Sequence, residues 1–429
     1  MPLSLLSRQR SRRSRRWLRS TVAVVAVGAL AAACGSSAKK GSTSTGSSQS
    51  TLTVGTLYAG SGDYSASSLP EYEGLQFWVN QVNGQGGVTI AGKKYHVKLV
   101  AYNDQSDPTT AATLYNQLLT QNKVDVFVAD FGSVLTAPAI TIAKEHHQVL
   151  FDPTGSGAVF FSNGANPYVL LTSLPTSAVW PNVAVDFLLS EHVTKVAIIY
   201  GTNDFDGSQA ATIKKGLEAK GVTPLYYQGV DSKTSDYGTI IQTVKDKSPQ
   251  AVIELGYENN DIAFLNDLRS AGVHFPFVLT PFPAQLPDLF AKDVGTAGLA
   301  YTFAYGVPPV LQINNVNYGM GFTAFSKAFS AAHGGATLNF LDVAGYNAGL
   351  VIQDSLAHAK STKQLDIRAG AAALSGKLRT LMGSFVIDDT GEQLGELLPV
   401  AQYFPNGGFK IVYPADQATT KPVYPAPAS

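Results

Sequence analysis

Hydroxyl-bearing residues and glycines follow two apolar runs in the middle of the chain. Gly132 and Ser133 come after the run Val124 to Val128, and Thr154 to Ser156 come soon after the run Val149 to Phe151. Hydroxyl groups and free backbone N–H groups at the start of a helix are well suited to bind an anion, most simply a carboxylate. An N-cap at Ser133 and a simple turn at residues 154–156 would explain the same residues, so the surrounding elements must decide between the two interpretations.

The two loops are predicted to leave neighbouring strands at one edge of a sheet. The run Val124 to Val128 has the pattern of a strand that is buried on both faces of a parallel sheet. Apolar residues at helical spacing from Thr136 to His146 predict a helix that begins near Ser133, and the run Val149 to Phe151 predicts the next strand. Open α/β sheets bind ligands outside the carboxyl ends of their strands, which is where both loops are expected.

Strands and helices alternate along the rest of the chain. About 380 residues follow residue 50, which suggests two domains of ordinary size. The expected strands are 52–57, 95–102, 195–200, 222–227, 251–255, 277–279 and one ending at 303; the expected helices are 70–83, one from 108, 175–191, one from 207 to 220, 237–245, 259–271, 318–332 and 341–359; a strand-rich tail is expected at 385–412. This alternation predicts an α/β fold with doubly wound parallel sheets.

The first 33 residues have the composition of an export signal. Seven arginines and no acidic residue occur in the first twenty positions, and an apolar run from Thr21 to Ala33 follows. A run of this length is too short to span a bilayer as a helix, which needs roughly 20 residues, so it predicts a secretory signal peptide. Ser14-Arg15-Arg16 leaves a twin-arginine export route open beside the general one.

The only cysteine of the chain ends this signal. The segment Leu30 to Cys34 resembles a bacterial lipobox, although the leucine that the pattern prefers three places before the cysteine stands one place further back. The resemblance implies cleavage before Cys34 and a lipid on its thiol. Residues 34–50 then form a flexible, polar linker, so the body is expected to be tethered to the outer face of the bacterial cytoplasmic membrane.

The composition of the remaining chain excludes some partners. Without the seven arginines of the signal, acidic side chains outnumber basic ones by about seven, so nucleic acid is not an expected partner. The single cysteine is assigned to the lipid, so no internal disulfide is expected in the body.

Four stretches together resemble one known protein family. They are 79–88 (VNQVNGQGGV), 103–108 (NDQSDP), the block 124–156, and Gly256-Tyr257-Glu258 before a helix that ends at 268–272 (LRSAG). This ordered set is similar to the type I periplasmic solute-binding proteins of the leucine/isoleucine/valine class, which serve ABC transporters, and the resemblance extends from about residue 51 to 413.

The resemblance implies two lobes that close over a ligand, joined by three hinge crossings. The crossings are expected near residues 171–175, 303–305 and 383–385. The first lobe would then comprise residues 51–172 and 304–382, the second lobe residues 173–303 and 383–413, and the C-terminal tail residues 414–429.

The resemblance also implies which residues bind the ligand. Ser133, with Gly132 and Phe131 beside it, falls on the position that binds the ligand's carboxylate, and Thr154, Gly155 and Ser156 fall on the loop that completes the polar contacts. Aromatic positions of the family fall on Phe205 and Tyr257 in the second lobe and near Tyr64 in the first. The implied ligand is a small carboxylate-bearing apolar solute, namely a branched-chain or aromatic amino acid or a related acid.

The chain departs from the family pattern at Pro281. The family usually has an acidic residue there, which pairs with the ammonium group of the ligand, and a buried ammonium without a counter-charge is costly. Either Glu258, Asp204 or Asp130 replaces this acid from another position, or the ligand is not an α-amino acid. The aromatic residues of the candidate loops favour an apolar or aromatic acid, although Phe160 and Phe282 could equally be core packing.

No catalytic or cofactor pattern is found in the sequence. There is no phosphate-binding loop, no nucleophile-elbow pattern and no Cys/His metal spacing, so no enzyme, cofactor or metal is expected. Two interpretations remain. The first is a receptor that delivers solute to ABC permease subunits, and the second is a lipid-anchored sensor of the same fold that signals to a partner protein.

Overall fold

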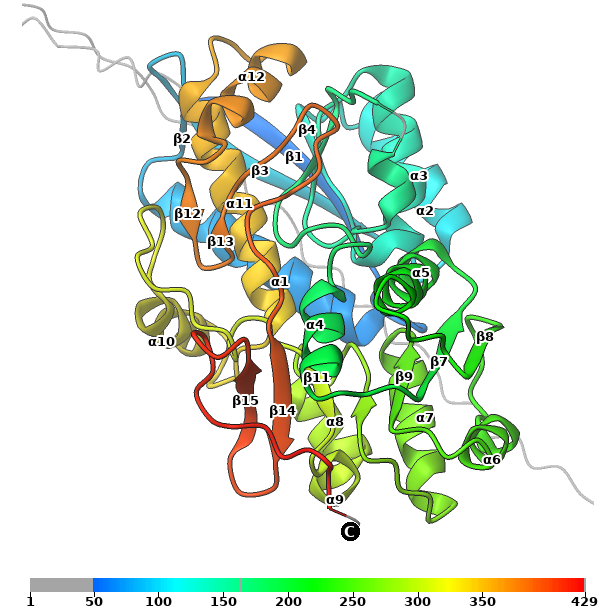
Figure 1. Cartoon of the computed structure of the whole chain (residues 1–429). Helices are drawn as coiled ribbons and strands as arrows, with labels where there is room; N and C mark the ends of the chain where they lie inside the picture. The colour runs from blue at the N-terminus through cyan, green and yellow to red at the C-terminus, as the bar shows by residue number, and fades with distance from the viewer. Residues whose placement is uncertain (1–48, 163, 428–429) are drawn as a thin grey trace, which may run out of the picture. The chain divides into compact units, whose positions relative to one another are not determined.

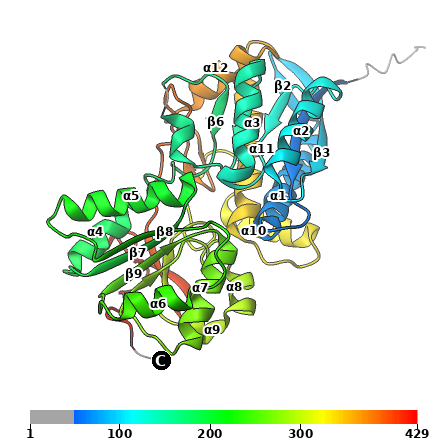
Figure 2. The same cartoon turned by 90° about the vertical axis from the view of Figure 1, so that its right-hand side faces the viewer.

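The computed structural model describes residues 49–162 and 164–427 of the chain. Residues from Gln49 onward form one compact unit, and the described part of it contains two large sheets covered by helices on both faces (Figures 1 and 2). We call each sheet with its helices a lobe. The expected α/β fold with two parallel-dominated sheets is confirmed.

The sheet of the first lobe has the strand order β2-β3-β1-β4-β5-β6. Its strands are β1 Ser50–Tyr58, β2 Val88–Ile90, β3 Lys93–Asn103, β4 Val126–Val128, β5 Leu150–Asp152 and β6 Val169–Leu171. All neighbours pair in parallel except β2 and β3, which form an antiparallel pair at the edge. The strands β4 and β5 are buried along their whole length, as their continuous apolar sequences predict.

The sheet of the second lobe has the order β15-β14-β11-β10-β9-β7-β8. Its strands are β7 Val196–Gly201, β8 Tyr226–Val230, β9 Ala251–Leu255, β10 Val278–Leu279, β11 Phe303–Tyr305, β14 Val400–Phe404 and β15 Gly408–Tyr413. Pairing is parallel from β8 to β11 and antiparallel from β11 to β15. The last two strands therefore return to the second lobe from the far end of the chain.

Helices cover both sheets in the layers that the alternation predicts. The helices at the first sheet are α1 Ser65–Gly84, α2 Pro108–Thr120, α3 Gly132–His146, α10 Phe322–Ala332, α11 Phe340–His358 and α12 Gln364–Leu374; those at the second are α4 Asn182–Ser190, α5 Asp204–Glu218, α6 Gly238–Lys245, α7 Glu258–Ser270, α8 Pro287–Asp293 and α9 Gly295–Leu299. A small sheet of β12 Arg379–Thr380 and β13 Gly383–Ser384 and the 3-10 turn Ala158–Phe161 complete the elements.

The helices α1 and α11 pack backbone to backbone in the first lobe. A Cβ atom at Gly345 would lie 1.8 Å from the carbonyl oxygen of Glu71, and one at Gly74 would lie 2.1 Å from the carbonyl oxygen of Asp342. Only glycine allows this approach. This close contact with α1 fixes the position of α11. Phe340, in the first turn of α11, lies between the two lobes.

One expected strand is wrong in its first half. The sequence predicted a strand from Val222 to Tyr227, but β8 begins at Tyr226. Val222 donates its N–H to the carbonyl of Leu217, and Gly221 has φ +80°, so these residues close the end of α5 instead. The β-branched residue was therefore part of a helix end and not of the sheet.

The residues at which the chain crosses between the lobes remain a proposal. Strand pairing and hydrogen bonds refine two of the three predicted crossings. The residues of the crossing predicted near 303–305 form β11 itself, which pairs within the second sheet. Residues beyond the predicted crossing at 383–385 still bond to the first lobe, because Leu171 N–H donates to the carbonyl of Gly391 at 3.0 Å. We therefore propose that the last crossing lies shortly before β14.

The C-terminal tail packs on the second lobe. Gln402 of β14 and Val423 exchange two hydrogen bonds, of 2.9 and 2.8 Å, and Ala426 N–H donates to the carbonyl of Pro276. Within the described residues, no helix combines the length and the hydropathy needed to cross a bilayer. The predicted signal peptide, Cys34 and nearly all of the predicted linker lie outside the described residues.

Candidate functional site

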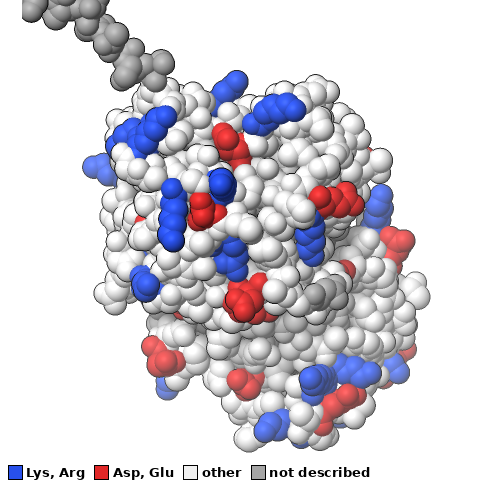
Figure 3. Space-filling model, turned by 90° about the horizontal axis from the view of Figure 1, so that it is seen from above, with Lys and Arg blue, Asp and Glu red and all other residues white. Residues whose placement is uncertain are grey.

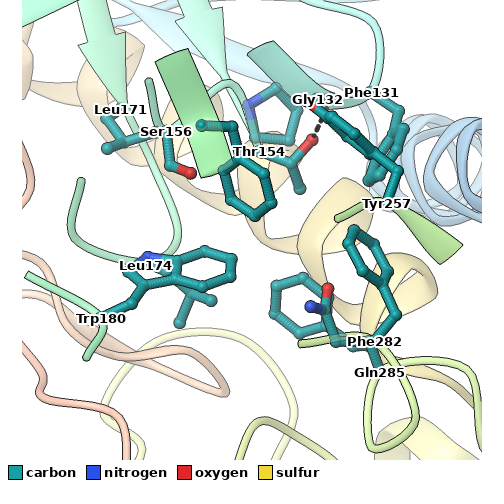
Figure 4. A pocket seen from close by; sticks show the side chains of 13 residues that line it. Phe131, Gly132, Thr154, Ser156, Leu171, Leu174, Trp180, Tyr257, Phe282 and Gln285 are labelled. Carbon is teal, nitrogen blue, oxygen red and sulfur yellow. Dashed lines mark hydrogen bonds between the residues drawn. The ribbon is translucent and has the colours of Figure 1, made fainter. Parts of the chain in front are cut away.

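A narrow pocket lies between the two lobes, where the carboxyl ends of strands from both sheets meet. It holds about 350 Å³ of space outside the protein atoms, and this volume includes space open to solvent. The residues that line it are mostly apolar or aromatic: Phe131, Gly132, Pro153, Thr154, Ser156, Leu171, Leu174, Trp180, Phe205, Tyr257, Phe282, Gln285 and Phe340 (Figure 4). Of the described residues that form this lining, none carries a charge.

The loops after β4 and β5 form the polar side of the pocket, which we call the first-lobe wall. Gly132 N–H donates to Thr154 Oγ1 at 3.0 Å (Figure 4). The Thr154 hydroxyl in turn donates to Glu71 Oε2 at 2.7 Å. Gly132 has φ +72°, and a Cβ atom there would lie 3.1 Å from the Tyr257 ring. Glycine therefore suits this position for its backbone conformation and for its closeness to the opposite lobe.

Ser133 lies directly behind this wall. Its backbone N–H donates to the Tyr257 hydroxyl at 3.2 Å, and its Oγ accepts from Gly157 N–H at 2.9 Å. Helix α3 begins at Gly132, and its N-cap residue, Phe131, makes no side-chain cap. The N-cap interpretation of Ser133 is therefore wrong, because the serine already belongs to the first helical turn.

The loop 154–156 is held by its own acidic neighbour. Gly155 N–H donates to Asp152 Oδ1 at 2.6 Å, and a Cβ atom at Gly155 would lie 2.5 Å from the Thr136 side chain. Ser156 N–H donates to the carbonyl of Thr154, while Ser156 Oγ is buried and has no partner among the described residues. Gly155 is thus a packing position, and Ser156 presents an unpaired hydroxyl at the pocket.

The opposite side of the pocket is aromatic, and we call it the second-lobe wall. The Phe205 ring lies 5.2 Å from both the Trp180 and the Tyr257 ring centroids, and the Tyr257 ring lies 5.7 Å from that of Phe282. Tyr64 of the first lobe stacks edge-on against Tyr257 at 5.0 Å but does not line the pocket. These rings give the pocket its shape and its apolar surface.

The structure also places the two rings that the sequence left undecided. Phe282 lines the pocket, and its N–H donates to Asp261 Oδ2 at 2.7 Å. Phe160 does not line it and instead packs against Phe161, with their ring centroids 6.5 Å apart. The core-packing interpretation thus suits Phe160 and not Phe282.

The three acids considered as substitutes for a charge at position 281 all have other partners. Glu258 Oε1 accepts from the Ser67 hydroxyl at 2.8 Å, Asp204 Oδ2 accepts from Val159 N–H at 3.0 Å, and Asp130 accepts from the Ser68 hydroxyl. No one of these described side chains lines the pocket. Burial raises the pKa of Glu258 to about 7 and raises the pKa of Asp130 well above its usual value.

Further acids lie beneath the first-lobe wall. Burial raises the pKa of Asp152 to about 7 and that of Glu71 well above its ordinary value.

The ion pairs found among the described residues are Lys292 with Asp293, His358 with Asp354, and Arg379 with Glu396. None of those pairs involves a residue of the pocket, so a solute anion would be bound there by N–H and O–H groups.

Several pocket residues were not predicted from the sequence. They are Pro153, Leu171, Leu174, Trp180, Gln285 and Phe340. Trp180 is one of three tryptophans and lies just after the first predicted crossing. This position could have indicated that it is a site residue. No sequence pattern distinguishes Gln285, because it lies in an irregular segment between β10 and α8.

Metal and nucleic-acid sites were not expected. Among the described residues, no three His, Cys, Asp or Glu side chains are grouped so that they could hold a metal ion. On the face seen in Figure 3, basic and acidic side chains are scattered among a majority of uncharged residues. That face therefore shows no basic patch of the kind that binds a phosphate backbone.

Comparisons with known proteins find relatives in sequence and in fold. The family model described as "Periplasmic binding protein" matches residues 51–408. Curated relatives include the Leu/Ile/Val/Thr-binding protein of Salmonella typhimurium, 23% identical over 53% of this chain, and the Leu/Ile/Val-binding protein of Escherichia coli, 22% identical over the same share. The chain spans 60% of the length of each of these relatives.

Solved structures share the fold. A leucine-binding protein of Thermotoga maritima has a TM-score of 0.73 at 17% identity, covering 84% of this chain and 98% of its own. A solute-binding protein of an ABC transporter from R. palustris, in complex with benzoate, has a TM-score of 0.70 at 18% identity, covering 88% and 96%. At these identities the likeness concerns the fold alone.

Proposed function

Since the chain belongs to the periplasmic binding protein family, we propose that it is a lipid-anchored solute-binding protein of an ABC importer. It captures a small apolar solute that bears a carboxylate, such as a branched-chain or aromatic amino acid or a related acid. The curated relatives are solute-binding proteins and not enzymes, and the chain is assigned a binding role in the same way.

The pocket between the lobes is the observation that carries this proposal. On its first-lobe wall the Ser156 hydroxyl has no partner among the described residues. The Gly132 N–H, the Thr154 hydroxyl and the Ser133 N–H behind them would exchange their protein acceptors for the carboxylate. These groups are the kind that bind a carboxylate without a cation. The aromatic second-lobe wall suits the apolar part of the same molecule, so the two walls together fit a solute with one anionic and one apolar end.

The names of the relatives support the same solute class. The curated relatives are named for leucine, isoleucine, valine and threonine, and the R. palustris structure contains benzoate. All of these molecules bear a carboxylate, and most have an apolar side. We infer that this chain uses its first-lobe wall for the shared carboxylate and its second-lobe wall for the part that differs.

Closure of the lobes is supported by hydrogen bonds that join them. The Ser67 hydroxyl of α1 donates to Glu258 of α7, and the Asn259 side chain donates to the carbonyl of Asp63 at 2.9 Å. The Ser133 N–H bond to Tyr257 also joins the lobes, and a solute carboxylate would take its place. We propose that a solute shifts the lobes toward this closed arrangement and that the closed form docks on the permease subunits.

Calorimetric titration tests the solute class. The purified protein is titrated with leucine and phenylalanine and with the deaminated acids of the same carbon skeletons. We expect at least one of these carboxylates to bind, with a heat signal that competes with the others for one site. If no amino acid or related acid bound, the proposed function would be wrong.

Membrane fractionation tests the anchor. We expect the Cys34→Ser variant to be released from the membrane fraction and to keep the solute affinity of the unchanged protein, because the lipid lies outside the pocket. A Ser36→Ala variant serves as the matched control and should stay in the membrane fraction. A Cys34→Ser protein that remained in that fraction would contradict the lipid assignment.

A further inference from the structure

Gln285 brings an amide group into the otherwise aromatic second-lobe wall. The residue is buried, with 1% of its surface exposed, and it lines the pocket. Its backbone N–H donates to the carbonyl of Phe282 at 2.8 Å, and its own carbonyl accepts from Phe340 N–H at 3.1 Å. Two hydrogen bonds therefore fix the backbone of Gln285, and with it the position from which its side chain extends.

The bonding of this amide defines which of its ends faces the pocket. Among the described residues, its one side-chain hydrogen bond runs from Nε2 to the carbonyl oxygen of Pro281, at 3.1 Å. A carbonyl oxygen can only accept, so the nitrogen must be at that end, and Oε1 remains as an acceptor without a protein donor. Figure 4 shows the carboxamide among the rings of the pocket. This oxygen lines the pocket and can therefore accept a hydrogen bond from a donor group on a bound solute.

The surroundings of Gln285 limit what this donor can be. No charged side chain lies among the described residues of the pocket lining. An ammonium beside Gln285 would be buried without a counter-charge, which is costly. A neutral hydroxyl needs only one acceptor and suits a wall of aromatic rings, which fit a flat aromatic solute.

We propose that the solute is an aromatic carboxylic acid without an ammonium group and that a hydroxyl on its ring donates a hydrogen bond to Gln285 Oε1. This inference rests on the proposed function and specifies the solute of the same site. Gln285 is then the residue that selects hydroxylated acids over their parent acids. A site whose acceptor has no protein donor rejects the analogue that lacks the hydroxyl, because that analogue closes off the acceptor without pairing it.

The test compares matched pairs of acids on the purified full chain. The probes are 3- and 4-hydroxybenzoate against benzoate, and 4-hydroxyphenylacetate against phenylacetate, each titrated by calorimetry. We expect at least one hydroxylated acid to bind about ten-fold more tightly than its parent. The methyl ether of that acid, which keeps the oxygen but lacks the donor, should lose this advantage.

Two variants separate the role of the amide from general packing. Gln285→Met keeps an unbranched side chain of similar length without the amide, and it should bring the ratio of the two affinities close to one. Gln209→Met is the control, because Gln209 is also buried, its Nε2 donates to the carbonyl four residues earlier at 3.1 Å, and it does not line the pocket. The control should keep the ten-fold ratio.

The outcomes distinguish this inference from the proposed function. Equal binding of each hydroxylated acid and its parent, or tighter binding of phenylalanine or leucine than of every acid, would overturn the inference and leave the proposed function standing. Binding of none of these carboxylates would overturn both. If Gln285→Met did not fold, the methyl ether comparison on the unchanged protein would still decide.

Discussion

The two walls of the pocket differ in how their residues are held. On the first-lobe wall, most backbone N–H and hydroxyl groups have partners within the protein, such as Gly132 with Thr154 and Thr154 with Glu71. On the second-lobe wall, Phe205, Tyr257 and Phe282 are held by contacts between their rings. The first wall is a hydrogen-bonded network, and the second is an apolar cluster.

This difference assigns different tasks to the two walls. Hydrogen bonds exchanged between protein, water and solute contribute little net free energy but fix the orientation of the solute. Burial of aromatic surface contributes more, and it follows the shape of the solute. The first wall should therefore determine the position of the carboxylate. The second wall should determine the affinity and the choice of solute.

The strongest test of the comparison is the removal of a ring from the second-lobe wall. We expect Phe205→Ala to lower the free energy of unfolding by about 3–5 kcal/mol, because the 3% exposed ring leaves a cavity against Trp180 and Tyr257. Urea denaturation without solute measures this change. Phe205→Leu keeps an apolar side chain and should cost less, whereas an Ala variant of unchanged stability would show that the ring cluster does not hold this wall.

Removing one hydroxyl behind the first-lobe wall should have a smaller effect. Ser133→Ala removes the hydrogen bond that we propose its hydroxyl donates to the solute carboxylate, and it leaves Gly157 N–H unpaired. The binding free energy should therefore weaken by about 1.5–3 kcal/mol. Calorimetry with the best-bound acid measures this loss. Ser355→Ala is the control, because it removes a buried serine hydroxyl from α11 and should leave the affinity unchanged. Unchanged affinity in Ser133→Ala would mean that Ser133 has only a structural role.

The first-lobe wall could be predicted from the sequence because its parts are local. The residues Gly132, Ser133 and Thr154 follow strands whose continuous apolar runs are recognisable in a single sequence. Parallel strands bring the ends of such runs to one sheet edge, so sequence order is enough to place the loops together. The hydrogen bond between Gly132 and Thr154 shows the result.

The second-lobe wall could be predicted only in part, because its residues are brought together by tertiary contacts. Phe205 and Tyr257 were found by family resemblance, whereas Trp180 and Gln285 come from irregular segments with no helical or strand period. The family resemblance predicts a departure at position 281, and the structure places a polar side chain of this segment, Gln285, in the pocket four residues further along. Whether Gln285 faces the pocket depends on its bond to Pro281, which the sequence does not reveal.

A contact between the two lobes should make closure depend on pH. Glu258 is buried against Ser67 of the first lobe, and burial raises its pKa from 4.5 to about 7, with a further contribution from the nearby Asp63 carboxylate. We expect the solute affinity to fall on the order of ten-fold between pH 5.5 and pH 8. Calorimetry across this range measures the change, and Glu258→Gln should remove most of it.

The sign follows from proton uptake. If Glu258 regains its ordinary pKa of 4.5 when the cleft opens, it binds more protons when the lobes close. Its contribution to closure is therefore complete below pH 4.5 and is lost as the pH rises through about 7. An affinity that increased over the same range would show that Glu258 is charged in the closed cleft.

The smallest effect concerns the single hydroxyl that links the two walls. The Tyr257 hydroxyl accepts from Ser133 N–H at 3.2 Å, and this N–H is one that we assign to the solute carboxylate. Binding must then displace the hydroxyl, so Tyr257→Phe should tighten binding by up to about five-fold, the value of one net hydrogen bond of about 1 kcal/mol. Tyr64→Phe, which changes a neighbouring ring outside the lining, should not. Weaker binding in Tyr257→Phe would mean that the hydroxyl contacts the solute itself, and the polar groups of the site would then come from both walls.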